Sequence, residues 1–317
     1  MTERVGFVVG ANLPWLRYGW DFGANAWSPQ GGLASRGRDG ALDERLGLLR
    51  ARGVEVLRWF VLCDGRAGLR VEPDESPAGL DDFVLHDFEF ALEYVGRAGL
   101  RMMPVLLDFH WCHRARVVNG VQLGGRTAML ARADWRAALV DRVIAPLAGR
   151  FGHDPRIYAW DVINEPEWVT FGLGTWRPWN MIRVSALRAY IGLAAERLHA
   201  LGSHPVTVGS ASARYLPAVQ GLGLDFYQPH WYDKFERSNP IATPVAALGC
   251  DAPVLLGEFP TRGSRKTPVA LISTAREAGY TGAMFWSVMA EDDATDFANA
   301  HSGLDEWTRA PDNPARA

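Results

Sequence analysis

The sequence predicts a single-domain (β/α)8 barrel, or TIM barrel, of the α/β class. Short apolar segments alternate with helical patterns along the 317 residues, and eight of the apolar segments are strand candidates. These segments lack the regular polar alternation of half-exposed strands, as expected for parallel strands that are buried on both faces. No G-x-G-x-x-G motif follows the first candidate strand, which argues against an open dinucleotide-binding sheet.

The eight strand candidates are rich in Val, Ile, Leu, Phe and Trp. In chain order they are Val5–Asn12, Val54–Phe60, Arg101–Asp108, Ile157–Asn164, Pro205–Gly209, Leu224–His230, Pro253–Glu258 and Gly282–Ser287. Their length and spacing are typical of the strands of a parallel barrel.

Helical patterns occupy the segments between these strands. Over Asp82–Ala98, apolar residues such as Phe88 and Leu92 recur at helical spacing, and Gly99 stands where a C-cap glycine belongs. Another helix is expected to begin at Asp134, a good N-cap residue. Further helices are predicted over Leu42–Arg52, Trp179–Leu201, Ala211–Gln220, Thr243–Leu248 and Pro268–Ala278.

The catalytic barrel is expected to cover residues 1–308, and a polar, Pro-rich tail covers 309–317. Three long connections, Leu13–Ala41, Trp111–Ala133 and Pro166–Pro178, follow the C-terminal ends of strands, where barrel enzymes place their sites. The chain has 13 Trp, more than a core usually needs, and several lie in these connections. Aromatic loops of this kind predict flat apolar platforms for sugar rings.

Composition and charge exclude several classes of partner. The formal net charge is -3 with no long run of one sign, so neither nucleic acid nor a membrane is an expected partner. A polyanionic substrate is not favoured either, although the net charge does not exclude a local basic patch. The three cysteines argue against a disulfide framework. The first apolar run is too short for a signal peptide, so a cytoplasmic location is expected; the oligomeric state is not indicated.

Polar or titratable residues stand at the C-terminal ends of six candidate strands. They lie in the segments Arg58-Trp59-Phe60, Asp108-Phe109-His110-Trp111, Asn164-Glu165-Pro166, His230-Trp231-Tyr232, Gly257-Glu258-Phe259 and Phe285-Trp286-Ser287. Two of them are glutamates, on the fourth and seventh strands. Glycoside hydrolysis requires such a pair of carboxyl groups, one held protonated and one ionised.

Two of these motifs carry a resemblance to a known group of enzymes. The segment Asp161-Val162-Ile163-Asn164-Glu165-Pro166 resembles the acid/base motif of the clan A glycoside hydrolases, and Gly257-Glu258-Phe259 resembles their nucleophile motif. The pattern is similar to glycoside hydrolase family 5, the cellulase and mannanase family. The additional residues that match this family are Arg58, His110, His230, Tyr232 and Trp286. The aromatic block 12–23 departs from the family pattern.

The resemblance implies a retaining β-glycosidase that needs no cofactor, with Glu165 as acid/base and Glu258 as nucleophile. It also implies that Asn164 binds the sugar 2-hydroxyl. Tyr232 would donate a hydrogen bond to Glu258, and Arg58 would keep that carboxylate ionised.

The remaining matches are implied to contact the ligand or the acid/base. His110 and His230 would orient ligand hydroxyls or the acid/base, and Trp286 would stack under the sugar. Trp15 and Trp111, in the aromatic connections, are two further candidates for substrate contact.

The expected substrates are β-linked oligosaccharides or small glycosides, gluco- or manno-configured. A transglycosylase with the same two glutamates and a non-catalytic carbohydrate-binding barrel stay open as alternatives, as does the choice between exo and endo action. No metal is expected, because the residues His110, Cys112 and His113 have no second ligand cluster at suitable spacing.

Overall fold

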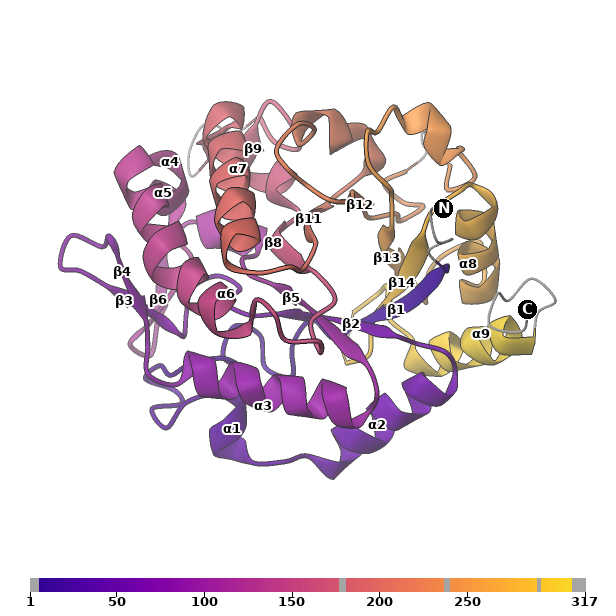
Figure 1. Ribbon diagram of the computed structural model, residues 1–317, viewed down its shortest axis with the longest axis horizontal. Helices are drawn as coiled ribbons and strands as arrows, with labels where there is room; N and C mark the ends of the chain where they lie inside the picture. The colour runs from indigo at the N-terminus through magenta and orange to yellow at the C-terminus, as the bar shows by residue number, and fades with distance from the viewer. Residues whose placement is uncertain (1–5, 177–180, 237–239, 290–291, 310–317) are drawn as a thin grey trace.

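The computed structural model describes residues 6–176, 181–236, 240–289 and 292–309. Eight parallel strands form one sheet in the order β12-β11-β8-β5-β2-β1-β14-β13, which confirms the predicted (β/α)8 barrel (Figure 1). Bridges from Tyr227 to Val254 and from His230 to Glu258 join the two end strands of this order. The strands are β1 (Val8–Asn12), β2 (Val56–Phe60), β5 (Arg101–Val105), β8 (Trp160–Asn164), β11 (Val206–Ser210), β12 (Gln228–Pro229), β13 (Leu256–Pro260) and β14 (Gly282–Trp286).

Helices surround this barrel (Figure 1). They include α2 (Gly40–Ala51), α3 (Val84–Arg97), α5 (Ala133–Leu139), α6 (Ala145–Phe151), α7 (Val184–Leu201), α8 (Pro268–Glu277) and α9 (Phe297–Arg309). A π-helical turn, η2 (Val140–Ile144), joins α5 to α6. Within the described residues, no helix is long and apolar enough to cross a membrane.

Side chains that accept backbone hydrogen bonds begin several of these helices. The Asp39 carboxylate accepts from Ala41 N at the start of α2, and the Thr267 hydroxyl accepts from Ala270 N at the start of α8. The predicted N-cap at Asp134 is wrong by two residues, because Arg132 is the N-cap of α5 and Asp134 lies inside the first turn.

Other boundaries also differ from the sequence-based expectations. The helices predicted over 211–220 and 243–248 are short 3-10 helices, η4 (Ala213–Ala218) and η5 (Val245–Leu248). Helix α9 was not predicted, although its buried residues Ala300, Leu304 and Trp307 recur at helical spacing. It runs to Arg309, one residue beyond the expected end of the barrel. Val5, Pro178, Trp179 and the tail 310–317 lie outside the described residues.

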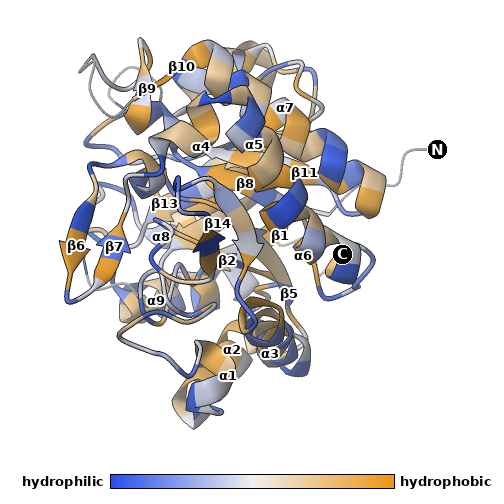
Figure 2. Cartoon of the chain, turned by 90° about the vertical axis from the view of Figure 1, so that its left-hand side faces the viewer, coloured by the Kyte–Doolittle hydropathy of each residue, from blue (hydrophilic) through white to orange (hydrophobic). Residues whose placement is uncertain are grey.

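Small elements fill the long connections at the C-terminal ends of the strands. Hairpin β6–β7 extends to one side of the barrel (Figure 2). These elements are α1 (Leu33–Arg36), β3 (Leu69–Val71), β4 (Pro77–Leu80), η1 (Phe109–Cys112), β6 (Arg116–Val118), β7 (Val121–Leu123), α4 (Thr127–Ala131), η3 (Pro166–Val169), β9 (Thr170–Phe171) and β10 (Ile182–Arg183).

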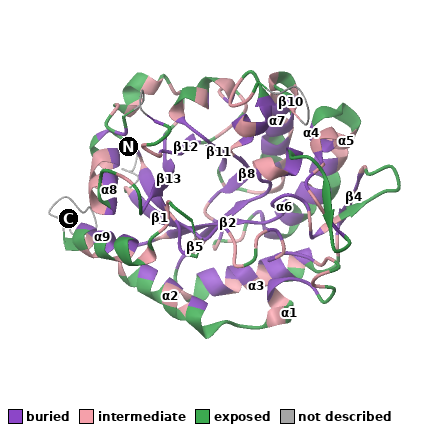
Figure 3. Ribbon diagram, turned by 180° about the vertical axis from the view of Figure 1, so that it is seen from behind, coloured by how far each residue is buried: buried purple, intermediate pink, exposed green. Residues whose placement is uncertain are grey.

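The barrel interior has an apolar layer below a polar layer. Val8, Val56 and Leu255 belong to a buried cluster near the strand N-termini, and the strands are buried along most of their length (Figure 3). At the other end, the register pairs Asn12 of β1 with Arg58 of β2 and with Trp286 of β14. Strand ends from opposite parts of the chain therefore meet at one level, where the polar side chains gather.

The long connection after β1 is held to the outer helices by a buried carboxylate. Asp87 of α3 accepts hydrogen bonds from the backbone N–H groups of Gly23 (2.8 Å), Gly32 (3.0 Å) and Ala34 (2.8 Å). Asp87 is 1% exposed, so these three donors have little access to water if the carboxylate is removed.

We expect Asp87→Ala to lower the free energy of unfolding by about 3 kcal/mol, because it leaves three buried N–H groups without an acceptor. Urea denaturation followed by circular dichroism measures this change. Asp82→Ala is the matched control, since the Asp82 side chain is 84% exposed and its loss is expected to cost below about 0.5 kcal/mol. Equal effects of the two substitutions would contradict this role of Asp87.

Candidate active site

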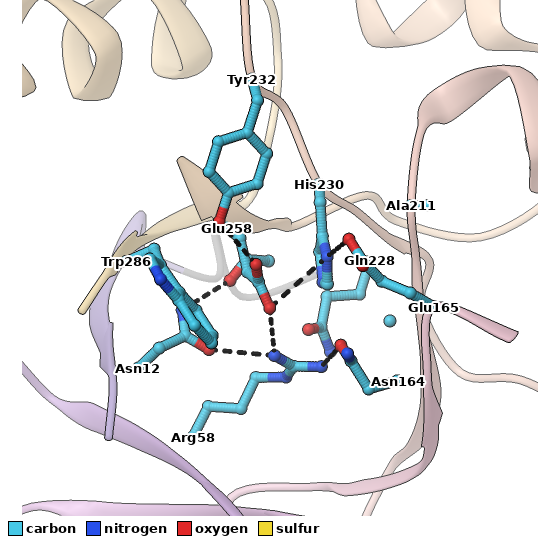
Figure 4. Close-up of polar contacts among 12 residues, drawn as sticks. Asn12, Arg58, Asn164, Glu165, Ala211, Gln228, His230, Tyr232, Glu258 and Trp286 are labelled. Carbon is cyan, nitrogen blue, oxygen red and sulfur yellow. Dashed lines mark hydrogen bonds and ion pairs between the residues drawn. The ribbon is translucent and has the colours of Figure 1, made fainter. Parts of the chain in front are cut away.

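Arg58 is the buried centre of the polar layer at the C-terminal end of the barrel (Figure 4). Its Nη1 donates to Glu258 Oε1 (2.7 Å) and Asn12 Oδ1 (3.0 Å). Its Nε and Nη2 donate to Asp161 Oδ2 (3.0 and 2.9 Å), and Nη2 also donates to Asn164 Oδ1 (2.8 Å). These bonds run in several directions within one plane, so they fix the position of the guanidinium.

The environment of Arg58 keeps its charge. Burial alone lowers its pKa, but the carboxylates of Asp161 and Glu258 raise the pKa above the usual arginine value. Gly209 of β11 leaves room for this group, because a Cβ at that position would lie 2.5 Å from Arg58 Nη2. The backbone N–H of Gly209 also donates to Asp161 Oδ1 (3.1 Å).

Glu258 lies in β13 and is held by two donors. Arg58 binds its Oε1, and the Tyr232 hydroxyl donates to its Oε2 at 2.7 Å. The residue is 4% exposed. Burial raises the pKa of Glu258, whereas His230, Arg58 and the Tyr232 hydrogen bond oppose that shift. The two contacts stabilise the carboxylate form.

Glu165 follows the last residue of β8 and has a left-handed backbone, with φ of 44°. Pro166 then opens the 3-10 helix η3, so the chain turns sharply at the strand end. The Trp168 indole donates to Glu165 Oε2 (2.8 Å), and His230 Nδ1 lies 2.8 Å from Oε1. Burial lowers the pKa of His230 to about 4, so this imidazole is neutral at pH 7.

The two glutamates therefore differ in protonation. Burial raises the pKa of Glu165 to about 7, the Trp168 hydrogen bond partly offsets this, and the charge of Asp108 adds to it. Glu258 has a guanidinium and a phenol as donors, whereas Glu165 has an indole and a neutral imidazole. When the two carboxyl groups hold one proton between them, these donors favour the proton on Glu165 and the negative charge on Glu258.

A second carboxylate network lies on the other side of Asn164. Asp108 accepts from the Tyr18 hydroxyl (2.8 Å) and from the Asn164 amide (3.3 Å), and His110 Nδ1 lies 2.8 Å from the same carboxylate. Because Asn164 also accepts from Arg58, its amide is oriented from both sides. Burial lowers the pKa of His110, but the hydrogen bond to Asp108 and the charge of that carboxylate raise it above the usual histidine value.

Above the two glutamates lies a cleft of about 460 Å³. Aromatic side chains form much of its wall, and those that line it are Trp15, Phe60, Phe109, Trp168, Tyr232, Phe235 and Trp286. Trp15 and Trp286 meet nearly edge to face with ring centroids 6.0 Å apart, and the Trp286 indole donates to Asp292 (2.7 Å). A concave site with apolar walls and few convergent polar groups suits a small ligand such as a sugar.

The structure brings most of the predicted site residues to this cleft. Those that line it are Trp15, His110, Asn164, Glu165, Tyr232, Glu258 and Trp286. Arg58 and His230 lie buried beneath the two glutamates, and each contacts a glutamate. These two residues therefore position the glutamates and do not face the open cleft.

The prediction that Trp111 contacts substrate is wrong. The residue is fully buried, because the 3-10 helix η1 turns its side chain inward while Phe109 and His110 of the same turn face the cleft. Its ring packs closely on the loop after β2: a Cβ at Gly65 would lie 3.0 Å from it.

Several residues that contribute to the cleft were not predicted from the sequence as site residues. Asp161 and Asp108 were noted only as parts of motifs, and Asn12 was not assigned a role, although all three hold Arg58 or Asn164. Trp168 was noted as a loop aromatic. Its position three residues after Glu165, inside the predicted connection 166–178, is the signal that could have identified it as a partner of that carboxyl group.

Glu165, His230 and Glu258 also form a group that could offer three ligand atoms to a metal ion. The Arg58 guanidinium lies 2.7 Å from Glu258, so a divalent cation at this position would meet an existing positive charge. The donor set fits a proton-transfer pair better than a cation site.

No protein-family model matches the chain. Two curated relatives are mannan endo-1,4-β-mannosidases. The protein from Mytilus edulis is 20% identical in an alignment of 320 positions that spans 89% of this chain and 83% of that protein. The protein from Cryptopygus antarcticus is 23% identical in an alignment of 346 positions that spans 94% of this chain and 85% of that protein.

Solved structures of similar fold cover nearly the whole chain. The endo-1,4-β-mannanase from Eisenia fetida has a TM-score of 0.80 at 22% identity, covering 97% of this chain and 92% of its own. The β-1,4-D-mannanase from Cryptopygus antarcticus has a TM-score of 0.79 at 21% identity, covering 98% and 92%. The relatives confirm the predicted resemblance, and this chain is a glycosyl hydrolase similar to the clan A enzymes of family 5.

Proposed function

We propose that the chain hydrolyses β-1,4-linked, manno-configured glycans with net retention at the anomeric carbon. The observation that carries this proposal is the short distance between the two glutamates. A carboxylate oxygen of Glu165 lies within 4.8 Å of a carboxylate oxygen of Glu258. Retaining enzymes hold their two carboxyl groups ~5–5.5 Å apart, whereas inverting enzymes need ~6.5–9.5 Å to admit water. The names of the relatives support the sugar and the linkage.

In the first step, protonated Glu165 donates its proton to the glycosidic oxygen as that bond breaks, and the Glu258 carboxylate forms a bond to the anomeric carbon. Arg58 and Tyr232 hold Glu258 in the ionised form until it attacks. Asn164, oriented by Arg58 and Asp108, is placed to bind the 2-hydroxyl of the same sugar.

In the second step, Glu165 is a carboxylate and removes a proton from the incoming water, whose oxygen displaces Glu258 from the anomeric carbon. The group that accepts the sugar can also be a second sugar, so transglycosylation uses the same residues. A purely carbohydrate-binding role has less support. Such a role would not require a charged donor, Arg58, on Glu258 and a neutral donor, Trp168, on Glu165.

The size of the cleft supports short substrates. Its volume of about 460 Å³ lies within the range of small-molecule sites, roughly 300–1,000 Å³. We therefore propose that oligosaccharides of a few sugar units, rather than long insoluble polymers, are the preferred substrates.

Substitution of the two glutamates tests the proposed roles. We expect Glu258→Gln to lower kcat on manno-oligosaccharides by at least roughly 10³-fold, because the amide cannot attack. Glu165→Gln should lower it by roughly 10²–10⁴-fold, and less on an aryl β-mannoside whose leaving group needs no proton. Steady-state kinetics on both substrates measure this difference, with exposed Glu44→Gln as the matched control.

Two results would contradict these assignments. Activity that survives in Glu258→Gln would mean that another group is the nucleophile. If proton NMR showed the α-anomer as the first product of a β-linked substrate, the enzyme would be inverting and the mechanism proposed above would be wrong.

The pH dependence of kcat/KM follows from the pKa shifts. Glu165 must be protonated in the first step, so kcat/KM is expected to fall as pH rises through about 7. Glu258 must be ionised, so kcat/KM is also expected to fall at acid pH. Burial raises the pKa of Glu258 and so moves this acid limb to higher pH. Trp168→Phe removes the indole donor that lowers the pKa of Glu165, and it should move the alkaline limb to higher pH. An unchanged or lower alkaline limb would contradict this assignment.

Product analysis tests the substrate size and the competing reaction. With a series of linear β-1,4-manno-oligosaccharides, we expect kcat/KM to reach its plateau within a few sugar units. At high acceptor concentration, hydrolysis products should still dominate over longer transfer products, as chromatography of the reaction mixture would reveal. Strong preference for long mannan, or mainly transfer products, would favour the alternatives.

A further inference from the structure

A second cavity, of about 430 Å³, lies beside the catalytic cleft. His110 lines both cavities, so the second one begins where the cleft ends on the β5 side. We call it the arginine cavity, because Arg66, Arg114 and Arg116 line it together with Asp64, the two histidines His110 and His113, and the end of β7.

The charge of this cavity is positive in a chain whose formal net charge is -3. Arg66 binds both oxygens of Asp64, through Nε (2.9 Å) and Nη2 (2.7 Å), so these two charges compensate one another. Within the part of the chain that the structure describes, no carboxylate forms an ion pair with Arg114 or Arg116. Two guanidinium groups are therefore available to an anion.

Backbone contacts hold the loops around this cavity, whereas the side chains of Arg114 and Arg116 are exposed. At the end of hairpin β6–β7, Gly124 N donates to the Asp64 carbonyl (3.2 Å) and Gly125 N donates to the His113 carbonyl (2.7 Å). Gly124 has a φ of 62°, and a Cβ there would lie 2.9 Å from the carbonyl oxygens of His110 and His113. The hairpin that carries Arg116 is thus attached directly to the loops after β2 and β5.

The aromatic connection after β1 supports the same cavity. The Arg66 guanidinium lies over the rings of Tyr18 (4.6 Å) and Trp27 (5.9 Å). The Trp27 indole donates to the carbonyl oxygen of Val118 in β6 (3.2 Å). Tyr18 also donates to Asp108 in the catalytic cleft. The residues that shape the arginine cavity therefore also contact the catalytic network.

We propose that the arginine cavity binds an oxyanion carried by the glycan, a carboxylate or a sulfate ester on a sugar next to the cleavage point. This inference rests on the function proposed above and specifies its substrate class. Guanidinium groups form bidentate hydrogen bonds with both kinds of oxyanion, and a neutral sugar does not need two uncompensated arginines beside its cleft.

The test compares one neutral ligand with two acidic derivatives of it. The neutral ligand is mannotetraose, and the derivatives carry carboxylates in place of the primary hydroxyl groups or sulfate esters at the same positions. Binding to Glu258→Gln is measured by isothermal titration calorimetry, so that turnover does not interfere. Hydrolysis of all three ligands by the wild-type chain, which keeps Glu258, is measured in parallel.

The variant Arg114→Gln/Arg116→Gln removes the two available charges. The matched control, Arg50→Gln/Arg97→Gln, removes two exposed arginines at the C-terminal ends of α2 and α3, away from the cleft. We expect at least one acidic derivative to bind about tenfold more tightly than the neutral ligand at low salt, and this preference should weaken as salt is added. Only the Arg114/Arg116 variant should lose the preference.

Equal binding of the neutral and acidic ligands would overturn the inference, as would a preference that survives in Arg114→Gln/Arg116→Gln. The derivative that binds more tightly identifies the anion as carboxylate or sulfate. If an acidic ligand binds in the expected way but none of the three ligands is hydrolysed, the anion site stands and the proposed hydrolysis fails. The two proposals can therefore be separated.

Discussion

The buried guanidinium of Arg58 is the constraint on which the rest of the site depends. A cation without exposed surface is stable only where carboxylates and amide oxygens surround it. Here these oxygens come from three strands, β1, β8 and β13. The strand register that brings these partners to one level is thus linked to the position of a single side chain. Gly209 belongs to the same constraint, since any side chain there would displace the guanidinium.

From this centre, the carboxyl groups of Glu165 and Glu258 acquire different properties although both stand at strand ends. Glu258 lies in the barrel wall and receives Arg58 directly. Glu165 is carried one residue beyond β8 by a left-handed turn, where its donors are Trp168 and a neutral His230. The difference in donor strength, rather than a difference in burial, separates their protonation states. A barrel produces it by placing one glutamate within a strand and the other just after one.

The strands and the polar residues at their ends could be predicted from sequence, because buried parallel strands are apolar runs and the residues after them must converge. Trp111 could not be placed in this way. Trp286 is the last residue of β14, whereas Trp111 lies beyond β5 in the 3-10 helix η1, which turns its side chain into the core. Loop conformation depends on tertiary contacts such as that between Trp111 and Gly65, which no periodic pattern encodes. Helix α9 differs, since its apolar spacing was readable.

The aromatic connection after β1, residues 13–41, has a physical role that its composition alone did not reveal. Asp21 and Asp87 hold its backbone, and its rings then extend in two directions. Trp15 reaches the wall of the cleft above Glu165 and Glu258, whereas the Trp27 indole donates a hydrogen bond to hairpin β6–β7. Tyr18 lies between them, with its hydroxyl on Asp108 and its ring under Arg66. Because this one connection contacts both cavities, the same residues support the loops that carry the arginines and the network that holds the two glutamates.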